Sequence, residues 1–522
     1  MTLAMNLGHL LTQAAQKFPH LPAMVHGTRS WSWLEVNRRV DSLATSLRRL
    51  GIEKGDRILI HAPNSPAYFE CMWATFKLGA VFTPTNFRLA PPEVAYIARS
   101  SCAKAMIYDR TLAGAADAAR NGAPSLQVLI SIDGPRKGEL SHESLCTSEG
   151  GAFPECEVRG DDPLWFFYTS GTTGRSKAAV LTHGQMAFVV TSQLADVMPG
   201  TTEEDRSLVL GPLSHAAGVH ALAQVARGAR SVFPTSRRFD ATEVWRLVQE
   251  HGITNMFAVP TMVKVLAEHE TVDRYDHSSL RYLVYAGAPM YREDQKYALQ
   301  KLGPVLVQYY GMGEVTANIT VLPARLHALD DGSMPVGSCG YARTGMEIAI
   351  LNDAGVPLST GQTGEICVRG PAVFVGYHND EAANAAAFRQ GWFHTGDLGY
   401  RDEGGFVYLS GRASDMYISG GSNVYPREVE EALLMHPAIS EAAVFGLPHP
   451  VWGEAGVAVV VLKEQRVLTH EDVLDHLDGK LARYKWPKQV IFRDSLPTST
   501  YGKVLKRTMR EALLREGPIW TP

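Results

Sequence analysis

The sequence predicts an α/β protein in which helix-covered parallel sheets are followed by a small β-rich unit and a compact α+β unit. Three observations predict this. Short apolar strands alternate with amphipathic helices up to about Ile319, the pattern of parallel sheets with helices on both faces. From Val336 to Tyr408 the chain is rich in glycine and short strands, as in a small barrel. Beyond Arg412, helices and strands return over about a hundred residues, the size of one domain.

The individual elements follow from short apolar runs separated by helical periods. We expect strands at Asp56–His61, Ala105–Tyr108, Leu164–Thr169, Ser231–Pro234, Asn255–Val259, Tyr282–Ala286 and Val305–Tyr309. We expect helices at Ser65–Leu78, Ala241–His251 and Arg292–Leu302. In the last unit we expect a helix at Glu428–Leu434, strands at Glu441–Phe445 and Gly456–Leu462, and a helix at Glu471–Ala482 with Thr469 as its N-cap.

Length and composition narrow the class of protein. The 522 residues suffice for roughly two to four domains. Hydrophobic residues make up 45% and charged residues 20%, which is ordinary for a soluble globular protein whose core needs no disulfide or metal for stability. With a net charge of −4, the bulk electrostatics do not argue for a nucleic-acid partner, so we expect none.

The cysteines and the N-terminal segment indicate the compartment. The six cysteines form no CxxC pair, and we assign none of them a metal-ligand spacing with a histidine. We therefore expect reduced thiols in a cytoplasmic protein. Met1–Phe18 is polar and helix-like, without the layout of a signal peptide. No apolar stretch reaches the ~20 residues of a membrane span, so we expect no integral membrane association.

The strongest motif is the loop that follows the expected strand Leu164–Thr169. It reads Thr169, Ser170, Gly171, Thr172, Thr173, Gly174, Arg175, Ser176 and Lys177. Glycines let backbone N–H groups approach phosphate oxygens, the hydroxyls add donors, and Lys177 adds positive charge. A polar turn between strands is the alternative for such a loop taken alone. The spacing from glycine to lysine does not match a Walker loop.

This loop resembles the signature of the adenylate-forming superfamily of acyl-CoA synthetases, peptide-synthetase adenylation domains and luciferases. Further matches follow in the family's order over most of the chain: Tyr310-Gly-Met-Gly-Glu314, Thr395-Gly-Asp397, Gly411-Arg412, Gly420-Gly421 with Asn423, and Gly502-Lys503. The resemblance implies an N-terminal domain over residues 1–412, built of two helix-flanked sheets plus a β-barrel at about 320–412. It also implies a small mobile α+β C-terminal domain over residues 413–522.

The same resemblance implies an AMP-forming acid–CoA ligase that uses ATP, Mg²⁺ and coenzyme A. Such an enzyme converts a carboxylic acid into an acyl-adenylate and pyrophosphate, and then passes the acyl group to the thiol of CoA. The adenylate is needed because a carboxylate is a poor electrophile. Bringing two anions together, the acid and the triphosphate, requires fixed donors and positive potential.

The resemblance also implies residue roles. Glu314 would bind Mg²⁺, because carboxylate and phosphate oxygens suit this hard ion. Asp397 would accept the two ribose hydroxyls, and Lys503 would bridge the acid and the α-phosphate. The expected ATP and AMP contacts are Thr169, Ser170, Gly171, Thr172, Thr173, Gly174, Lys177, Gly287, Ala288, Pro289, Tyr309, Tyr310, Gly311, Met312, Asp397, Arg412 and Lys503. The expected catalytic residues are Lys503, Glu314, His215 and Thr172.

Two more sites are implied for the acid and the thiol. His215 matches a position that lines the acyl pocket and gates the active site, within a pocket expected to comprise His215, Ala216, Ala217, Ala286, Gly287, Thr316 and Ala317. After adenylation, rotation of the C-terminal domain would bring a CoA tunnel over the adenylate. That tunnel is expected to comprise Ser419, Gly420, Gly421 and Trp452. For Trp452, ordinary core packing is the alternative.

Two positions depart from the family pattern. Ser414 stands at the hinge, where Asp or Lys is usual, and Asp415 follows and could share the role. Gly313 stands where threonine is usual, which removes a hydroxyl donor to phosphate but leaves the metal ligand in place.

The expected acyl pocket is small-sided and uncharged, which favours a medium- or long-chain fatty acid or an aryl or alicyclic acid. Residues 214–219 contain no acidic side chain, so an amino-acid substrate would bury an unpaired ammonium group. We place no arginine in the pocket for a dicarboxylate. The alternatives are an enzyme that loads a carrier-protein pantetheine and a ligand-binding pseudoenzyme. A homodimer is compatible with the sequence.

Overall fold

The computed structural model describes residues 3–148, 151–170, 176–288, 290–327, 337–419, 422–498, 504–516 and 520. Within these residues the strands form one two-stranded ribbon and four larger sheets. The ribbon pairs β1 (Leu3–Ala4) with β9 (Val158–Arg159). None of the described helices is both long and apolar enough to cross a membrane.

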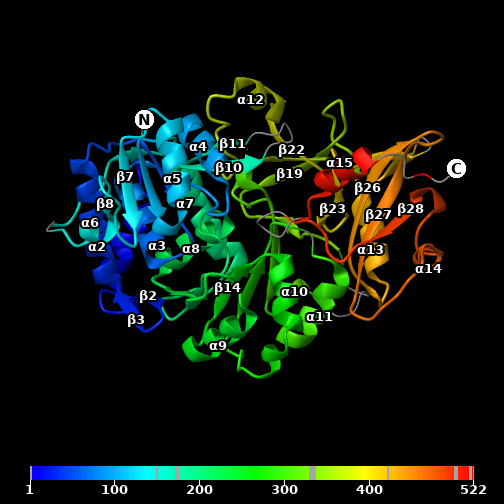
Figure 1. The fold of residues 1–522 in the computed structure, drawn as a ribbon, viewed down its shortest axis with the longest axis horizontal. Helices are drawn as coiled ribbons and strands as arrows, with labels where there is room; N and C mark the ends of the chain where they lie inside the picture. The colour runs from blue at the N-terminus through cyan, green and yellow to red at the C-terminus, as the bar shows by residue number, and fades with distance from the viewer. Residues whose placement is uncertain are drawn as a thin grey trace.

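The first large sheet has seven strands in the order β11-β10-β5-β4-β6-β7-β8. Its strands are β4 (Arg57–His61), β5 (Val81–Pro84), β6 (Ala105–Asp109), β7 (Val128–Ile132), β8 (Leu140–Ser141), β10 (Pro163–Ser170) and β11 (Ser176–Thr182). The associated helices are α1 (His9–Lys17), α2 (Trp33–Arg49), α3 (Pro66–Lys77), α4 (Pro91–Ser100), α5 (Ala113–Gly122), α6 (His142–Cys146) and α7 (His183–Ser192). Helix α3 begins where the Ser65 hydroxyl accepts from the Tyr68 N–H and Pro66 takes the first turn. Strands β7 and β8 and helices α2 to α6 of this part lie at the blue and cyan end of the molecule, and β10 and β11 lie nearer its middle (Figure 1).

The second large sheet has nine strands in the order β18-β17-β16-β15-β14-β12-β13-β2-β3. Its strands are β2 (Pro22–His26), β3 (Arg29–Ser32), β12 (Arg206–Leu208), β13 (Arg230–Phe233), β14 (Asn255–Ala258), β15 (Tyr282–Tyr285), β16 (Leu306–Tyr310), β17 (Thr320–Leu322) and β18 (Tyr341–Ala342). Its helices are α8 (Ala216–Arg227), α9 (Ala241–His251), α10 (Pro260–Glu268) and α11 (Arg292–Leu302). The strands from β12 to β16 pair in parallel, so their carboxyl ends share one edge.

Two five-stranded sheets complete the fold. The first contains β19 (Glu347–Leu351), β20 (Gly364–Arg369), β21 (Phe388–Arg389), β22 (Trp392–Arg401) and β23 (Val407–Arg412), with α12 (Glu381–Ala387) beside it. These antiparallel strands form a half-barrel in the part of the chain where the sequence predicts a barrel. The second contains β24 (Tyr417–Ser419), β25 (Ser422–Val424), β26 (Ile439–His449), β27 (Gly453–Leu462) and β28 (Gln489–Phe492), with helices α13 (Pro426–Leu434), α14 (His470–His476) and α15 (Lys506–Glu516).

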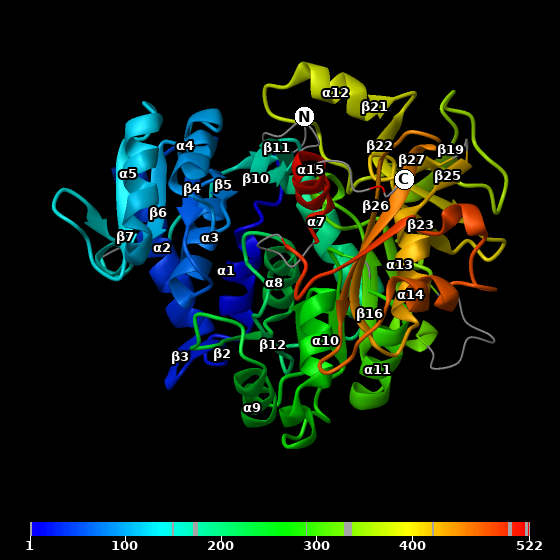
Figure 2. The same cartoon turned by 45° about the vertical axis from the view of Figure 1, so that its right-hand side comes forward.

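The C-terminal sheet and α13 lie beside α10 and α11 (Figure 2). Polar contacts join the two parts. The Lys264 ammonium donates to the Ser440 carbonyl at 3.2 Å, and the Tyr291 hydroxyl donates to a Glu430 carboxylate oxygen at 3.4 Å. Packing between them is therefore partly polar, as in interfaces between domains that move.

The α/β fold class is confirmed, and nearly every expected element is present within one to three residues of its predicted ends. One helix is shorter than expected. The predicted helix Glu471–Ala482 has its N-cap at Thr469, whose hydroxyl accepts from the Asp472 N–H, but it ends at His476. Gly479 adopts a φ of +72°, a left-handed conformation that ends helical geometry and that glycine accepts without strain.

Candidate active site

The predicted phosphate loop connects the two strands of a hairpin, β10 and β11. Thr169 pairs with Lys177 and Ser170 pairs with Ser176 at the end of this ladder. Gly171, Thr172, Thr173 and Gly174 lie outside the described residues. The hairpin therefore fixes the two ends of the loop, with a hydroxyl on one strand and an ammonium group on the other.

Glu314 lies next to this hairpin, on the short helical turn that follows β16. Its carboxylate is buried and accepts two hydrogen bonds on Oε1, from the Thr169 hydroxyl and from the Tyr377 hydroxyl, each at 2.9 Å. Its backbone carbonyl accepts from the Phe374 N–H at 2.8 Å. Among the described residues both side-chain hydrogen bonds end on Oε1, so Oε2 keeps its lone pairs. A buried carboxylate with a free oxygen beside a phosphate loop fits a divalent cation.

The segment Phe374–Asp380 contributes two residues that the sequence analysis missed. Burial and the neighbouring Glu314 carboxylate raise the pKa of Tyr377, which keeps its hydroxyl a donor. The ring of Tyr377 lies 5.5 Å from the Lys177 ammonium, which also lies 3.3 Å from an Asp380 carboxylate oxygen. The Ala383 N–H and then Lys177 lower the pKa of Asp380, which also caps α12. The only sequence signal for this segment was an aspartate before an alanine-rich helix.

A second cluster forms around Asp397, next to Tyr310, the last residue of β16. The Tyr310 hydroxyl donates to Asp397 Oδ2 at 2.7 Å, and Arg412 Nε lies 3.2 Å from Asp397 Oδ1. Asp397 and Arg412 are direct partners in the antiparallel pair β22–β23, which explains why motifs fifteen residues apart in sequence meet. Burial and the Asp397 carboxylate raise the pKa of Tyr310 well above its usual range. The structure thus brings together three residues predicted to contact adenosine.

The expected adenine-side residues lie at the carboxyl ends of parallel strands, where ligands bind in open α/β sheets. Gly287 and Ala288 follow β15, and Gly311 and Met312 follow β16. Gly287 has a φ of +90°, and a β-carbon at Gly311 would lie 2.4 Å from the Ala317 Cα. Both positions therefore require glycine. Pro289 lies outside the described residues.

Gly313, one of the two departures from the family pattern, has a steric explanation. A β-carbon there would lie 2.6 Å from Phe167 Cδ1 and 2.8 Å from Thr169 Cγ2. The bulk of Phe167, on β10, leaves no room for a side chain at this turn. The loss of a threonine hydroxyl is thus coupled to an aromatic residue on the neighbouring strand.

His215 occupies the N-cap position of α8, between the two sheets. Its Nδ1 lies 2.8 Å from the Ser214 hydroxyl, and its ring packs edge-on against Phe167 with centroids 5.2 Å apart. Burial lowers the pKa of His215 to about 4, so the ring is neutral at pH 7. A neutral imidazole suits a position beside an apolar pocket.

The other expected acyl-pocket residues gather near His215. Ala217, Ala286 and Tyr309 belong to one hydrophobic cluster, and Ala216 and Ala317 pack against it. Tyr309 also stacks on Phe257, with ring centroids 5.9 Å apart.

Thr316 and Ala317 both adopt left-handed conformations, with φ of +50° and +58°. Such conformations cost non-glycine residues free energy and are frequent at ligand sites.

The predicted hinge and CoA-tunnel residues are only partly placed. Ser414 and Asp415 lie in the turn between β23 and β24, where the Ser414 hydroxyl is 3.3 Å from Asp415 Oδ1. Ser419 is buried at the end of β24. Trp452 lies in the turn between β26 and β27 with 45% of its surface exposed, which rules out the core-packing alternative. Gly420, Gly421 and Lys503 lie outside the described residues.

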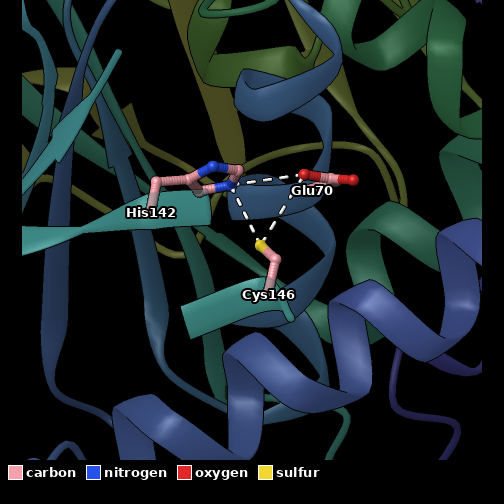
Figure 3. Close-up of side chains that lie close together, drawn as sticks. All are labelled: Glu70, His142 and Cys146. Carbon is pink, nitrogen blue, oxygen red and sulfur yellow. Dashed lines mark hydrogen bonds and ion pairs between the residues drawn. The ribbon is translucent and has the colours of Figure 1, made fainter. Parts of the chain in front are cut away.

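A separate polar cluster, remote in sequence from these motifs, joins Glu70 to α6 (Figure 3). His142 Nε2 lies 3.3 Å from Glu70 Oε2 and 3.3 Å from Cys146 Sγ. The four-residue spacing of His142 and Cys146 is a metal-ligand spacing that the sequence analysis overlooked. Arg39, however, already binds both Glu70 oxygens through Nε and Nη2. The ion pair and hydrogen bonds account for this cluster without a metal ion.

Two family models match the chain. The model described as AMP-binding enzyme matches residues 11–378, and the model described as AMP-binding enzyme C-terminal domain matches residues 428–503.

The similarity to known proteins covers nearly the whole chain. A feruloyl-CoA synthase of an Amycolatopsis species is 36% identical over 97% of this chain and 98% of its own length. A long-chain-fatty-acid–CoA ligase of Mycobacterium tuberculosis is 34% identical over 97% and 98%. The crystal structure of ATP-bound MatB from Rhodopseudomonas palustris superposes with a TM-score of 0.87 at 30% identity, covering 97% of this chain and 99% of that one.

Proposed function

Because this chain belongs to the AMP-binding enzyme family, we propose that it activates a fatty, aryl or alicyclic carboxylic acid and transfers it to coenzyme A. It is an acid–CoA ligase that uses ATP and CoA, like the relatives that carry this name. The observation that carries the proposal is the convergence of distant motifs on one site. Thr169, Glu314 and Tyr377 meet at the phosphate loop, while Tyr310, Asp397 and Arg412 meet beside it.

The reaction has two displacements. In the first, a carboxylate oxygen of the acid attacks the α-phosphorus of ATP, the bond to the β-phosphate oxygen breaks, and pyrophosphate leaves. In the second, the sulfur of CoA attacks the acyl carbon, its proton passes to solvent, and AMP leaves. The first step brings anions together, so fixed cations and donors lower its barrier.

We assign the nucleotide contacts as follows. Thr169 and Lys177 bind phosphate oxygens, Asp397 accepts the ribose hydroxyls, and Arg412 supports the ribose or phosphate. Tyr310 packs against adenine while its hydroxyl holds Asp397 in place. A carboxylate has two acceptor oxygens, which suits the two hydroxyls of a vicinal diol.

Mg²⁺ is the metal that this site fits, with Glu314 as its protein ligand. The ion would neutralise charge on the phosphate oxygens. Thr169 and Tyr377 hold the carboxylate in place through Oε1 and leave Oε2 for the ion.

The acyl group is assigned to the apolar cluster between α8 and the second sheet. The cluster has small side chains at Ala217 and Ala286, and the ring of His215 beside it is neutral. A buried arginine, Arg343, lies near this cluster, but Asp196 pairs with it at 3.6 Å and neutralises it. An uncharged acyl group therefore suits the pocket better than a second carboxylate.

We also propose that residues 413–522 form a mobile domain hinged at Ser414 and Asp415. In that case Ser419, Gly420, Gly421 and Trp452 would line the CoA tunnel in one orientation, and Lys503 would serve adenylation in the other. A cytoplasmic location and a homodimer remain predictions.

Lys503→Ala tests whether Lys503 acts only in the first half-reaction, adenylate formation. We expect loss of acid-dependent pyrophosphate release, because one ammonium group no longer bridges acid and α-phosphate, while CoA still attacks a supplied acyl-AMP. Both half-reactions are followed by chromatography of AMP and acyl-CoA. Lys301→Ala, which removes a surface ammonium paired with Asp273, is the control and retains both activities. Equal loss of both half-reactions in Lys503→Ala would contradict the assignment.

The function itself is tested by pyrophosphate release with ATP, Mg²⁺ and CoA across a panel of fatty, aryl, alicyclic, dicarboxylic and amino acids. We expect release with apolar monoacids, and formation of the matching acyl-CoA. No release with any acid would leave a ligand-binding pseudoenzyme. Release without acyl-CoA would point to a carrier-protein thiol as the acceptor.

A further inference from the structure

Three side chains of metal-ligand type meet on the half-barrel, and none of them has a role in the site described above. Glu365 and Cys367 belong to β20, and His394 belongs to β22. Glu365 and Cys367 are two positions apart, so their side chains leave the same face of the strand. Cys367 is paired directly with His394 in the antiparallel ladder. One ligand atom of each residue therefore lies within 4.8 Å of the other two.

The register of the two strands brings Glu365 to this group. Between Glu365 and Cys367 the ladder shifts, because β20 spans two residues there while β22 spans four. The additional residues of β22 form a turn around Gly396, whose φ is +72°. The Gly396 N–H donates to Glu365 Oε1 at 3.0 Å. The group is thus joined directly to the turn that carries Asp397.

The three side chains converge on one atom, His394 Nδ1. It lies 2.7 Å from Glu365 Oε2, 3.3 Å from Cys367 Sγ and 2.7 Å from Arg389 Nη2. A ring nitrogen bears either a proton or a lone pair. With a proton, Nδ1 opposes the N–H of the arginine, and with a lone pair it opposes the carboxylate oxygen. One of these two short contacts is therefore unfavourable in either state of the ring.

The guanidinium group of Arg389 shows that positive charge is already drawn to this position. It also lies 3.2 Å from Glu365 Oε2. The side chain of Arg389 is 52% exposed, whereas that of His394 is 7% exposed. The arginine can therefore move into solvent and leave its place to a smaller cation. Such a cation would accept lone pairs from the carboxylate, the imidazole and the sulfur at once.

The cluster of Glu70, His142 and Cys146 differs in this respect. Its arginine, Arg39, is only 14% exposed, binds both oxygens of Glu70 and also pairs with Glu143. A cation there would have to displace a bidentate ion pair, which is among the stronger polar interactions in proteins. The argument therefore applies to the half-barrel group alone.

We propose that Glu365, Cys367 and His394 bind a divalent transition-metal ion of the Zn²⁺ class through Oε2, Sγ and Nδ1. Thiolate and imidazole ligands favour Zn²⁺ over Mg²⁺, and three protein ligands leave a fourth position for water. The Cys367 thiol would release its proton to solvent when the ion binds. The ion would fasten β20 to β22 at the turn that carries Asp397. This site is distinct from Glu314 and does not depend on the proposed function.

Cobalt binding to the full-length protein tests the proposal. The protein is kept reduced, dialysed against a chelator and titrated with Co²⁺, whose thiolate complexes absorb in the near ultraviolet. We expect one bound Co²⁺ per chain with this absorption band, displaced by Zn²⁺ but not by excess Mg²⁺. Absence of the band, or its loss on adding Mg²⁺, would overturn the proposal.

Two substitutions locate the ion. Cys367→Ser should abolish the thiolate band. His394→Gln should weaken binding by at least about ten- to a hundredfold, because even residues that only support a metal ligand contribute this much. Cys102→Ser, which removes an exposed thiol, is the control and keeps the band. If His394→Gln does not fold, Cys367→Ser decides, and a band that survives Cys367→Ser would overturn the proposal.

Arg389→Ala distinguishes a metal site from an ordinary ion pair. If the guanidinium group and the metal ion compete for the same ligands, removing the arginine should strengthen Co²⁺ binding about two- to fivefold, the range expected for a half-exposed ion pair. Unchanged or weaker binding would show that the two cations do not exchange and would overturn the proposal.

Discussion

At the scale of single residues, Glu314 is held by two hydroxyl groups, and one of them comes from a residue outside the recognised motifs. We predict that Tyr377→Phe lowers kcat/KM for ATP about ten- to a hundred-and-fiftyfold. The reason is that a hydrogen bond to a charged group is worth about 1.5–3 kcal/mol, and its loss lets the carboxylate turn away from its proposed metal-binding position. Initial rates of pyrophosphate release against ATP concentration measure this.

The control for this substitution is Tyr408→Phe, which removes a hydroxyl that donates to Asp402 at 3.0 Å on the half-barrel. It should leave the rate unchanged. If Tyr377→Phe also left the rate unchanged, the Tyr377 hydroxyl would have no role in placing Glu314.

The residues that could be predicted from sequence are those inside contiguous motifs. Thr169, Glu314 and Asp397 could be proposed as site residues because each lies in a run with several matching neighbours. Tyr377 and Asp380 could not, because their contacts, with Glu314 and with Lys177 of β11, are created only by the fold. The role of Gly313 also needed the structure, since the clash that requires glycine involves Phe167, far away in sequence.

At the scale of elements, hydrogen bonds and an ion pair join a short π-helical segment, Gln193–Val197, to the residues that follow β18. Asp196 accepts from the Thr344 N–H at 2.9 Å and from the Ser192 hydroxyl at 3.1 Å, and it lies 3.6 Å from Arg343 Nε. Burial lowers the pKa of Arg343 to about 10, yet its guanidinium stays charged at neutral pH. The carboxylate is thus the counter-ion of a buried charge.

We predict that Asp196→Asn lowers the free energy of unfolding by about 3–5 kcal/mol, because it leaves the Arg343 charge buried without a counter-ion. Urea unfolding followed by tryptophan fluorescence measures it. Asp196→Asn combined with Arg343→Met should recover most of the loss, since the double variant buries no unpaired charge. A loss below about 1 kcal/mol in the single variant would show that solvent reaches this pair.

Element boundaries were predictable where apolar periodicity and capping agreed, as for α9 and α11, whose predicted and observed ends coincide. Boundaries were not predictable where the backbone conformation depends on a single glycine. The end of α14 is set by backbone geometry around Gly479, which amphipathic spacing does not reveal.

At the scale of the whole molecule, buried neutral histidines couple folding to pH. Burial lowers the pKa values of His61, His183, His215, His220 and His327 from 6.5 to about 4. The unfolded chain therefore binds more protons than the folded chain between about pH 6.5 and 4. Stability is fully present above pH 6.5 and falls as the pH drops towards 4.

We predict that the free energy of unfolding falls between pH 7 and pH 5, by at most about 1.4 kcal/mol per pH unit for each histidine. Urea titrations at pH 7, 6 and 5 measure this. His61→Gln should reduce the slope of the free energy of unfolding against pH by the contribution of one histidine. A slope that His61→Gln leaves unchanged would show that the His61 ring titrates alike in the folded and unfolded protein.

The fold class was predictable because alternation of strands and helices extends over hundreds of residues and tolerates local errors. The packing of the C-terminal sheet against α10 and α11 was not, because it depends on a few polar contacts such as Tyr291 with Glu430. Such contacts leave no periodic signal in a sequence.

The contacts that build the proposed nucleotide site also decide when during synthesis this site can form. Thr169 and Glu314 are 145 residues apart, and Tyr310 and Asp397 are 87 apart. Contacts of such long range form late, because loop-closure entropy must be overcome first. A chain growing from the ribosome therefore cannot complete the proposed nucleotide site until β22 and β23 have emerged. Until then the hairpin β10–β11 can pair with β5 and bind Glu314 through Thr169, and the emergence of Asp397 and Arg412 adds the remaining part of the proposed site.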